Sequence, residues 1–278
     1  MLSYRHSFHA GNFADVIKHI VLVEILEYLT KKDSPFEYVD THAGAGLFNL
    51  KSSEAQKLQE FGNGIGKLKS ENFPELKAYF DVIRSCNKSG ALSFYPGSPM
   101  IARYFLRPQD RAWLFELHPK DYRLLRDYMN PGKKIRVSCE DGLAGMTTLL
   151  PPASRRGLTL IDPSYEIKSD YDQVVDNVVK AHKKFSTGIY AIWYPVVDRS
   201  RIERMERKFI KSGIKNIQRF EVGVAADSAD GGMTSSGMII VNPPWMLFEK
   251  MSGLLPKLAE TLANGNEHFF KCDIMAKE

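Results

Sequence analysis

The sequence predicts an α/β fold in which a mainly parallel sheet is covered by helices on both faces. Two observations carry this prediction: apolar strand-like stretches alternate with helical patterns, and four of the strands end near an acidic residue and a turn. Seven stretches have the strand pattern: residues 36–40, 111–116, 134–138, 157–162, 188–194, 216–224 and 237–242. Helical crossovers between successive strands let those strands run in one direction.

Length and composition limit the class of protein. The chain has 278 residues, of which 44% are hydrophobic and 26% charged, so we expect residues 1–278 to form a single globular domain. No apolar run is long enough for a membrane span and no signal-peptide core follows Met1, which predicts a cytoplasmic protein. Three cysteines without CxxC spacing argue against a disulfide framework and a zinc site. A net charge of +5 permits a polyanionic partner without requiring one.

Helical patterns fill the stretches between the strands. A helix is expected over residues 14–29, capped by Asn12, and its role is mostly packing. About seventy residues separate the first two strands where a simple crossover unit needs roughly thirty. Helical patterns at 54–69 and 74–87 therefore predict a helical insertion subdomain over residues 50–95. The last dozen residues are polar enough to fray.

A loop of small residues follows the first strand at positions 40–46. Its glycines, Gly44 and Gly46, would let a cofactor approach the backbone closely. A dinucleotide fingerprint would place a third glycine where Asn49 stands, which favours S-adenosylmethionine (AdoMet) over NAD. A glycine-rich turn without a ligand is the alternative for this loop taken alone.

Acidic residues after the next strands extend the cofactor hypothesis. Glu116 is placed to hold the two hydroxyls of a ribose, and Asp141 with Gly142 is placed to meet an adenine. Asp162 ends the fourth strand. Acids at the ends of four successive strands predict one ligand groove along the carboxyl edge of the sheet, although any single acid is also a plausible helix cap.

The tetrapeptide at 162–165 points to chemistry on an aromatic amine. The Asp162 carboxylate and the Pro163 carbonyl can accept hydrogen bonds from an exocyclic amino group, and the Tyr165 ring offers a face for a base. Residues 242–245, Asn-Pro-Pro-Trp, match this pattern more closely, but they follow the seventh strand. Chain order therefore favours Asp162, and we interpret 242–245 as a rigid turn with a buried tryptophan.

Two further segments have polar features that suit nucleic acid. The pair His6 and His9 lacks the spacing of a metal site. Residues 4–9 mix aromatic and cationic side chains, which suits contact with RNA; a disordered tail is the alternative for this segment. A helix expected over 199–211 carries one basic face. That face is either a solvated surface or a contact for polyanions; its residues are Arg201, Arg204, Lys208 and Lys211.

Taken together, the sequence resembles the RlmJ family, bacterial methyltransferases that act on adenine N6 in 23S ribosomal RNA. The resemblance spans nearly the whole chain and lies in residues 1–12, 40–46, 95–99, 116–119, 154–157, 193–195 and 237–245. It implies a seven-stranded Rossmann-like methyltransferase fold with a small helical insertion, AdoMet as methyl donor and one adenine of 23S RNA as acceptor. The implied AdoMet contacts are His19, His42, Ser98, Glu116, Asp141, Gly142 and Asp162.

The resemblance also implies roles at the reacting centre. Asp162, with Pro163 and Tyr165, would be catalytic, and Tyr4 would touch the RNA. The family motif is Asp-Pro-Pro-Tyr, whereas Ser164 stands at its third position here, so some rigidity is lost while the acceptor groups remain. We expect a monomer that works without a metal.

Three other functions fit parts of the sequence. A DNA adenine-N6 methyltransferase uses the same tetrapeptide chemistry, but the small size of the chain, without a DNA target-recognition domain, favours RNA. A non-catalytic AdoMet-fold binding protein is supported by Ser164 alone, and a nicotinamide oxidoreductase is disfavoured by Asn49.

Overall fold

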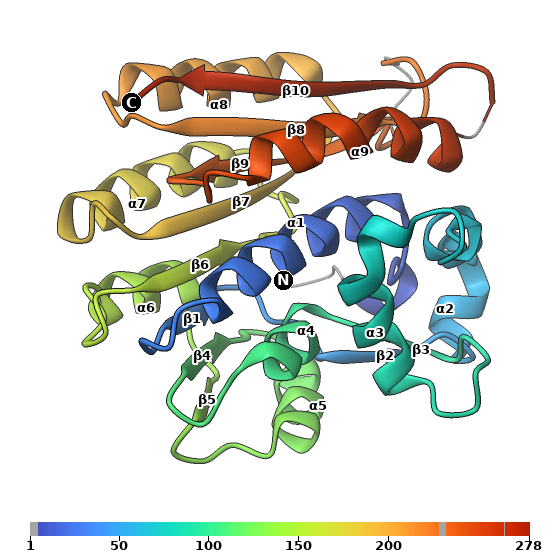
Figure 1. Ribbon diagram of the computed structural model, residues 1–278, viewed down its shortest axis with the longest axis horizontal. Coiled ribbons are helices and arrows are strands. Elements are labelled where there is room, and N and C mark those ends of the chain that lie inside the picture. Colours follow the sequence, from blue (N-terminus) through green and yellow to red (C-terminus); the bar gives the residue numbers. More distant parts are fainter. Residues whose placement is uncertain (1–4, 228–231, 264) are drawn as a thin grey trace.

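A computed structural model describes residues 5–227, 232–263 and 265–278 and contains a central eight-stranded sheet (Figure 1). The strand order is β10-β8-β9-β7-β6-β1-β4-β5. Strands β5, β4, β1, β6 and β7 run parallel, β9 is antiparallel to β7 and β8, and β10 is antiparallel to β8. The bounds are β1 (Glu37–Asp40), β4 (Arg111–Phe115), β5 (Ile135–Ser138), β6 (Gly157–Ile161), β7 (Ile189–Val196), β8 (Ile217–Gly223), β9 (Ser235–Val241) and β10 (Phe269–Ala276).

Seven of these strands were predicted and are confirmed, and the α/β fold class is confirmed with them. The expectation that the last dozen residues fray is wrong, because β10 pairs with β8 along its length. Asp273 accepts a hydrogen bond of 3.0 Å from Nε of Arg219, and the Phe269 ring lies against Gly223. Polar residues in this segment reflect a strand at the edge of a sheet.

Helices cover both faces of the sheet (Figure 1). One face carries α1 (Phe13–Thr30), α4 (Ser98–Phe105), α5 (Pro119–Met129) and α9 (Leu247–Leu262). The other face carries α6 (Gly142–Leu149), α7 (Asp170–Lys184) and α8 (Arg199–Lys211). None of the helices within the described ranges is both long and apolar enough to cross a membrane.

Helix α1 lies at the centre of the molecule. The Asn12 side chain caps it by accepting a hydrogen bond of 2.9 Å from the amide of Asp15, as predicted. The helix is buried on nearly every side, and four of its buried residues are polar: Asp15, Lys18, His19 and Glu24. A buried charge requires a partner, so α1 has a larger role than the packing predicted for it.

The segment between β1 and β4 contains a two-stranded antiparallel sheet and several short helices at the right of Figure 1. They are β2 (Leu47–Asn49), α2 (Ser53–Leu58), α3 (Lys77–Cys86), β3 (Phe94–Pro96) and the 3₁₀ helices Glu60–Asn63, Ile65–Lys67 and Pro74–Leu76; a further one, His6–Phe8, precedes α1. The predicted helix at 54–69 is shorter than expected, because α2 ends at Leu58 and the next residue, Gln59, adopts a left-handed φ of 52°. Gly64 then abuts the backbone of Gly11, where an added Cβ would lie 2.1 Å from the carbonyl oxygen.

The Asn-Pro-Pro-Trp segment at 242–245 lies at the amino edge of the parallel strands. Val241 pairs with Tyr190 near the start of β7, and the Asn242 side chain donates hydrogen bonds to the carbonyls of Ser186 and Gly188. The prediction of a buried tryptophan is wrong, because Trp245 is 78% exposed. Leu247, at the start of α9, is buried instead.

Candidate functional site

The carboxyl edge of the parallel strands gathers the acids that the sequence singled out. Asp40 ends β1, Glu116 follows β4, Asp141 lies beyond β5 and Asp162 follows β6. Because the order β6-β1-β4-β5 is parallel throughout, all four acids lie at one edge of the sheet. This edge is the usual place for a ligand in a doubly wound sheet.

Lys18 of α1 joins two carboxylates at this edge. Its Nζ atom lies 2.6 Å from Oδ2 of Asp162 and 2.8 Å from Oδ1 of Asp15, and its side chain is almost fully buried. Nζ also lies 5.5 Å from the ring centroid of Trp193, within the range of a cation–π contact. Burial lowers the pKa of Lys18, but the two carboxylates outweigh burial and raise that pKa above its ordinary value.

The two carboxylates respond differently to the same burial. Burial raises the pKa of Asp162, and Lys18 opposes part of that rise. Burial also acts to raise the pKa of Asp15, but the positive charges of His6 and Lys18 hold it well below its ordinary value. Asp15 Oδ2 lies 2.8 Å from Nε2 of His6 and accepts a hydrogen bond of 2.8 Å from the amide of Gly11.

Asp40 lies at the end of β1 and is fully buried. It accepts hydrogen bonds from the Tyr38 hydroxyl at 2.7 Å and the His42 amide at 3.3 Å. Burial raises the pKa of Asp40 to about 6, although hydrogen bonds from Ser98 and Tyr38 oppose the rise. Ser98, at the start of α4, is therefore brought against the loop that follows β1.

His19 of α1 has one satisfied and one unsatisfied ring nitrogen. Its Nδ1 lies 2.8 Å from the Tyr95 hydroxyl, which in turn lies 3.0 Å from the Tyr79 hydroxyl. Its Nε2 is buried and has no hydrogen-bond partner among the described residues. Burial lowers the pKa of His19 to about 3, so the ring is neutral near pH 7. An orphaned buried nitrogen is costly and is a natural partner for a ligand.

Residues around the glycine loop have polar groups that suit a nucleoside. Glu116 accepts hydrogen bonds from the amides of Gly44 at 2.8 Å and His118 at 2.7 Å, and burial raises its pKa. Carboxylate oxygens accept more than one hydrogen bond, so Glu116 can still meet ribose hydroxyls. Gly44 has a left-handed φ of 60°, and a Cβ on Gly142 would lie 2.0 Å from the Thr41 carbonyl oxygen.

His42 and Asp141 complete the predicted set. The His42 ring is half-buried, its Nδ1 lies 2.8 Å from the Thr41 hydroxyl, and burial lowers its pKa to about 4. Asp141 caps α6 by accepting two amide hydrogen bonds through Oδ1. The orphaned His19 nitrogen is a feature that a polar group of AdoMet would satisfy, so the residues present fit this group.

The Asp162–Tyr165 segment is well packed. Pro163 is buried, Ser164 is half-buried and Tyr165 is 8% exposed with a left-handed φ of 53°. The Tyr165 hydroxyl donates a hydrogen bond of 2.7 Å to the Trp193 carbonyl, and its ring centroid lies 4.4 Å from that of Tyr171. Stacking of a base on Tyr165 stays a prediction, and it requires part of this packing to open.

The sequence interpretation missed two residues of the site, Asp15 and Lys18, and named one that the structure does not describe. Lys18 was not predicted, although Asp15, Lys18 and His19 occupy positions i, i+3 and i+4 and so share a face of α1. A polar face on an otherwise apolar helix was the available signal. Tyr4 lies outside the described residues.

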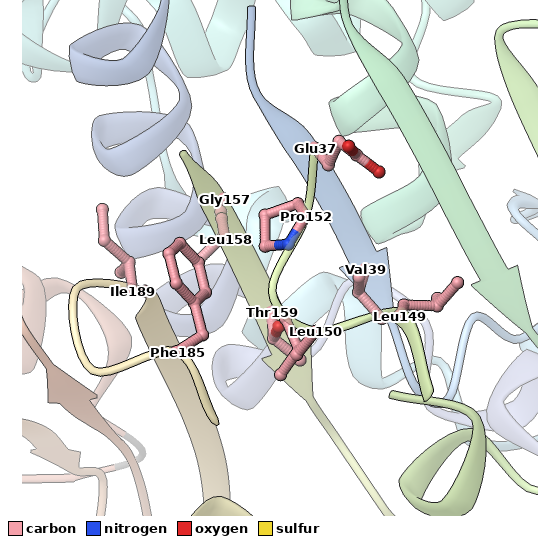
Figure 2. Close-up of a pocket in the computed structure, with 11 residues that line it drawn as sticks. Glu37, Val39, Leu149, Leu150, Pro152, Gly157, Leu158, Thr159, Phe185 and Ile189 are labelled. Atoms are coloured by element: carbon pink, nitrogen blue, oxygen red, sulfur yellow. The ribbon is translucent and has the colours of Figure 1, made fainter. Parts of the chain in front are cut away.

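Other clusters and cavities contribute less to the site. No group of three or more His, Cys, Asp or Glu side chains within residues 5–227, 232–263 and 265–278 is arranged to hold a metal. A cavity of about 10 Å³ lies between Phe185, Pro152 and Leu150 at the amino ends of β1, β6 and β7 (Figure 2). It has room for about one water molecule, so it is too small for a cofactor.

Comparisons with known proteins agree with this geometry. The family model described as "Ribosomal RNA large subunit methyltransferase D, RlmJ" matches residues 33–272. A protein of Escherichia coli K12 named Ribosomal RNA large subunit methyltransferase J is 51% identical over 264 residues, with 94% of each chain covered. Its namesake from Haemophilus influenzae is 49% identical over 265 residues, with the same coverage.

A solved structure gives the same result at the level of the fold. A crystal structure of a protein from Legionella pneumophila superposes with a TM-score of 0.87 and 39% identity, covering 96% of this chain and 98% of that one. The family model covers most of the chain, and the curated relatives align over nearly all of it. The chain therefore belongs to the RlmJ family of large-subunit ribosomal RNA methyltransferases.

Proposed function

We propose that this protein transfers a methyl group from AdoMet to the N6 amino group of one adenine in 23S ribosomal RNA. Family membership supports the reaction class, the cofactor and the RNA substrate. The observation that carries the proposal within the site is Asp162, a carboxylate at the end of β6 whose side chain is 14% exposed and whose Lys18 partner is shared with Asp15. It lies at the same edge as the residues that fit AdoMet.

AdoMet supplies an electrophilic methyl group on a sulfonium. In this proposal Glu116 holds the ribose, Asp141 and Gly142 meet the adenine, and His19 offers its orphaned Nε2 to a polar group of the cofactor. His42 and Ser98 line the same loop and complete the AdoMet site with Asp162. A neutral His19 adds no positive charge beside a sulfonium, which suits a cationic ligand.

The chain must make a poor nucleophile react. The N6 lone pair of adenine is delocalised into its ring, so Asp162 and the Pro163 carbonyl would accept the N6 hydrogens and hold the nitrogen in line with the methyl group. Positive charge then develops on N6. The negative charge of the Asp162 carboxylate would stabilise it, and burial strengthens this effect because the surroundings have a low dielectric constant.

Lys18 would act by positioning Asp162. A carboxylate whose pKa is raised by burial takes up protons more readily, and a protonated Asp162 accepts hydrogen bonds less strongly. The ammonium at 2.6 Å favours the ionised form and fixes one oxygen, which leaves Oδ1 for the substrate. Tyr165 would support the base from the side of Trp193, and Tyr4 would contact the RNA.

The proposal extends to the organisation of the protein. We propose a monomeric methyltransferase domain over residues 1–278, with residues 50–95 as a helical subdomain, that acts on ribosomal RNA in the cytoplasm without a metal. Support for the subdomain comes from the helices α2 and α3, which lie in the chain between β2 and β3, the two strands of a small separate antiparallel sheet.

The direct test is to incubate the protein with labelled AdoMet and protein-free 23S rRNA and to identify the methylated nucleoside. We expect N6-methyladenosine, at least about 100-fold less of it per unit time with Asp162→Asn, and an AdoMet dissociation constant within a few-fold of wild type. Asp176→Asn is the matched control, since Asp176 is exposed and pairs only at the surface with Lys208. Label in double-stranded DNA but not in RNA would replace the RNA assignment, and unchanged turnover of Asp162→Asn would remove Asp162 from the reaction.

A further inference from the structure

A second concave surface lies beside the proposed catalytic segment. It is a groove of about 470 Å³ between the first turns of α7 and α8, lined by Lys168, Ser169, Tyr171, Asp172, Asp198, Ser200, Arg201, Arg204 and Met205. Helix α7 follows β6 and helix α8 follows β7, so both first turns lie at the carboxyl edge of the sheet. The groove therefore opens at the same edge as Asp162.

One contact joins the groove to the proposed catalytic segment. Tyr171 lines the groove, and its ring centroid lies 4.4 Å from that of Tyr165. Lys168 is six positions after Asp162, on the loop that connects the segment to α7. A polymer whose reacting nucleotide lies at Asp162 would reach this groove with its adjoining nucleotides.

The charges in the groove suit phosphates. Lys168, Arg201 and Arg204 line it, and the side chain of Arg204 is 72% exposed. In the free protein Arg201 pairs with Asp198 and Arg204 pairs with Asp172, both at 3.0 Å. Pairs this exposed are worth only about 0.2–1 kcal/mol, so a phosphate, which binds arginine through two parallel hydrogen bonds, can displace them at little cost.

Apolar side chains flank the groove where a base would lie. Ile167 is 65% exposed and precedes Lys168, and Val197 is 49% exposed and precedes Asp198. Both lie in loops at the carboxyl edge, so neither is part of a core face. An enzyme that acts on a base must take it out of its stack, and exposed apolar side chains beside the site can cover the neighbouring base that loses its partner.

We propose that this groove binds the RNA strand next to the target adenosine, with Lys168, Arg201 and Arg204 on its phosphates and Ile167 and Val197 against a neighbouring base. The inference rests on the proposed function and adds to it a substrate-binding surface outside the AdoMet and adenine sites. RNA is favoured over an acidic protein because the groove combines separated cations with apolar flanks and joins the edge where the base reacts.

The test compares a triple variant, Lys168→Gln with Arg201→Gln and Arg204→Gln, with the control Arg207→Gln. Arg207 lies on the same helix, pairs with Glu203 and does not line the groove. With 23S rRNA as substrate we expect the triple variant to raise the KM at least tenfold, with an unchanged dissociation constant for AdoMet. The slope of log binding constant against log salt should fall by about 2, since each lost phosphate contact on a single strand changes it by about 0.7.

A variant that is expected to strengthen RNA binding separates an effect on binding from an effect on folding. Asp172 pairs with Arg204 and Lys208, so Asp172→Asn should free positive charge and lower the KM for RNA several-fold, an effect that general destabilisation would not produce. Equal KM values and salt slopes for the triple variant and Arg207→Gln would overturn the groove assignment, even while wild type makes N6-methyladenosine. Absence of that product with wild type would instead refute the proposed function, and direct RNA-binding measurements on the same variants would still decide the groove.

Discussion

Replacing Lys18 with methionine would test the charge balance of the site most directly. Methionine has a similar length and no charge, so Lys18→Met keeps most of the packing and removes the ammonium. Asp162 and Asp15 each have an oxygen within 2.8 Å of its nitrogen. Without Lys18 the two carboxylates would face each other in a buried place with no cation between them.

The expected loss of stability is large and depends on pH. Breaking a buried ion pair from one side costs about 3–5 kcal/mol when the remaining charge stays ionised. The protein can reduce this cost by protonating Asp162, whose pKa is already raised by burial and would rise further in the variant. A raised folded-state pKa stabilises the protein at low pH, and that contribution is lost as the pH rises through it. As the pH rises, the free energy of unfolding of the variant should therefore fall relative to wild type by up to about 1.4 kcal/mol per pH unit for each such carboxyl group.

Urea unfolding at pH 5.5, 6.5 and 7.5 measures this difference. Tryptophan fluorescence is a suitable signal, because Lys18 lies over the Trp193 ring. Lys208→Met is the control: it removes an exposed pair with Asp172 and Asp176 and should cost about 0.2–1 kcal/mol at all three pH values. A Lys18→Met protein as stable as wild type, with the same pH profile, would refute the view that Lys18 balances two ionised carboxylates.

Three further predictions concern neighbouring residues. His19→Gln should make the free energy of unfolding less dependent on pH. Burial lowers the folded-state pKa of His19 to about 3, so wild type loses stability as the pH falls below 6.5. In urea titrations, wild type should lose about 1.4 kcal/mol more than the variant between pH 7.5 and 5.5. Gly142→Ala should weaken AdoMet binding at least tenfold in calorimetry and cost about 1–3 kcal/mol of stability, because the new Cβ would lie 2.0 Å from the carbonyl oxygen of Thr41. Gly132→Ala is the control, because Gly132 has open space around it. Equal AdoMet affinity and stability of the two variants would contradict the close approach at Gly142. Tyr165→Phe should lower the free energy of unfolding by about 0.5–1.5 kcal/mol, because it loses the hydrogen bond from the Tyr165 hydroxyl to the Trp193 carbonyl. A large change in the KM for RNA would show that the hydroxyl, rather than the ring, contacts the substrate.

The periodic parts of the fold could be predicted from the sequence, and the exceptions have physical reasons. Seven strands and the helices α1, α3 and α8 were predicted from the runs and spacing of their apolar residues, because burial of those residues dominates their formation. Strand β10 was missed because Lys271 and Asp273 alternate with apolar residues, a pattern shared by polar tails and edge strands. Trp245 was expected inside because tryptophan is usually well buried, but α9 begins two residues later and turns Leu247 inward instead.

Only the part of the site that lies at the ends of the strands could be predicted from the sequence. Parallel strands bring their carboxyl ends together, so the acids after β1, β4, β5 and β6 could be grouped without a structure. Lys18 could not be placed in the same way, since it is separated from Asp162 by 144 positions and the packing of α1 against the sheet decides their contact. The groove between α7 and α8 depends on how two helices lie beside each other, which spacing along one helix does not determine.

Strand β10 also bears on how the protein avoids aggregation. Strand β8 is buried along nearly its whole length and contains Ile217, Phe220 and Val222, so an uncovered β8 would offer other chains a long apolar edge for pairing. Strand β10 covers that edge and presents a new one that carries Lys271 and Asp273, charges that disfavour pairing between molecules. A deletion or a bulky fusion that displaces β10 would thus expose the apolar edge of β8, and would lower solubility even if the proposed AdoMet site stayed intact.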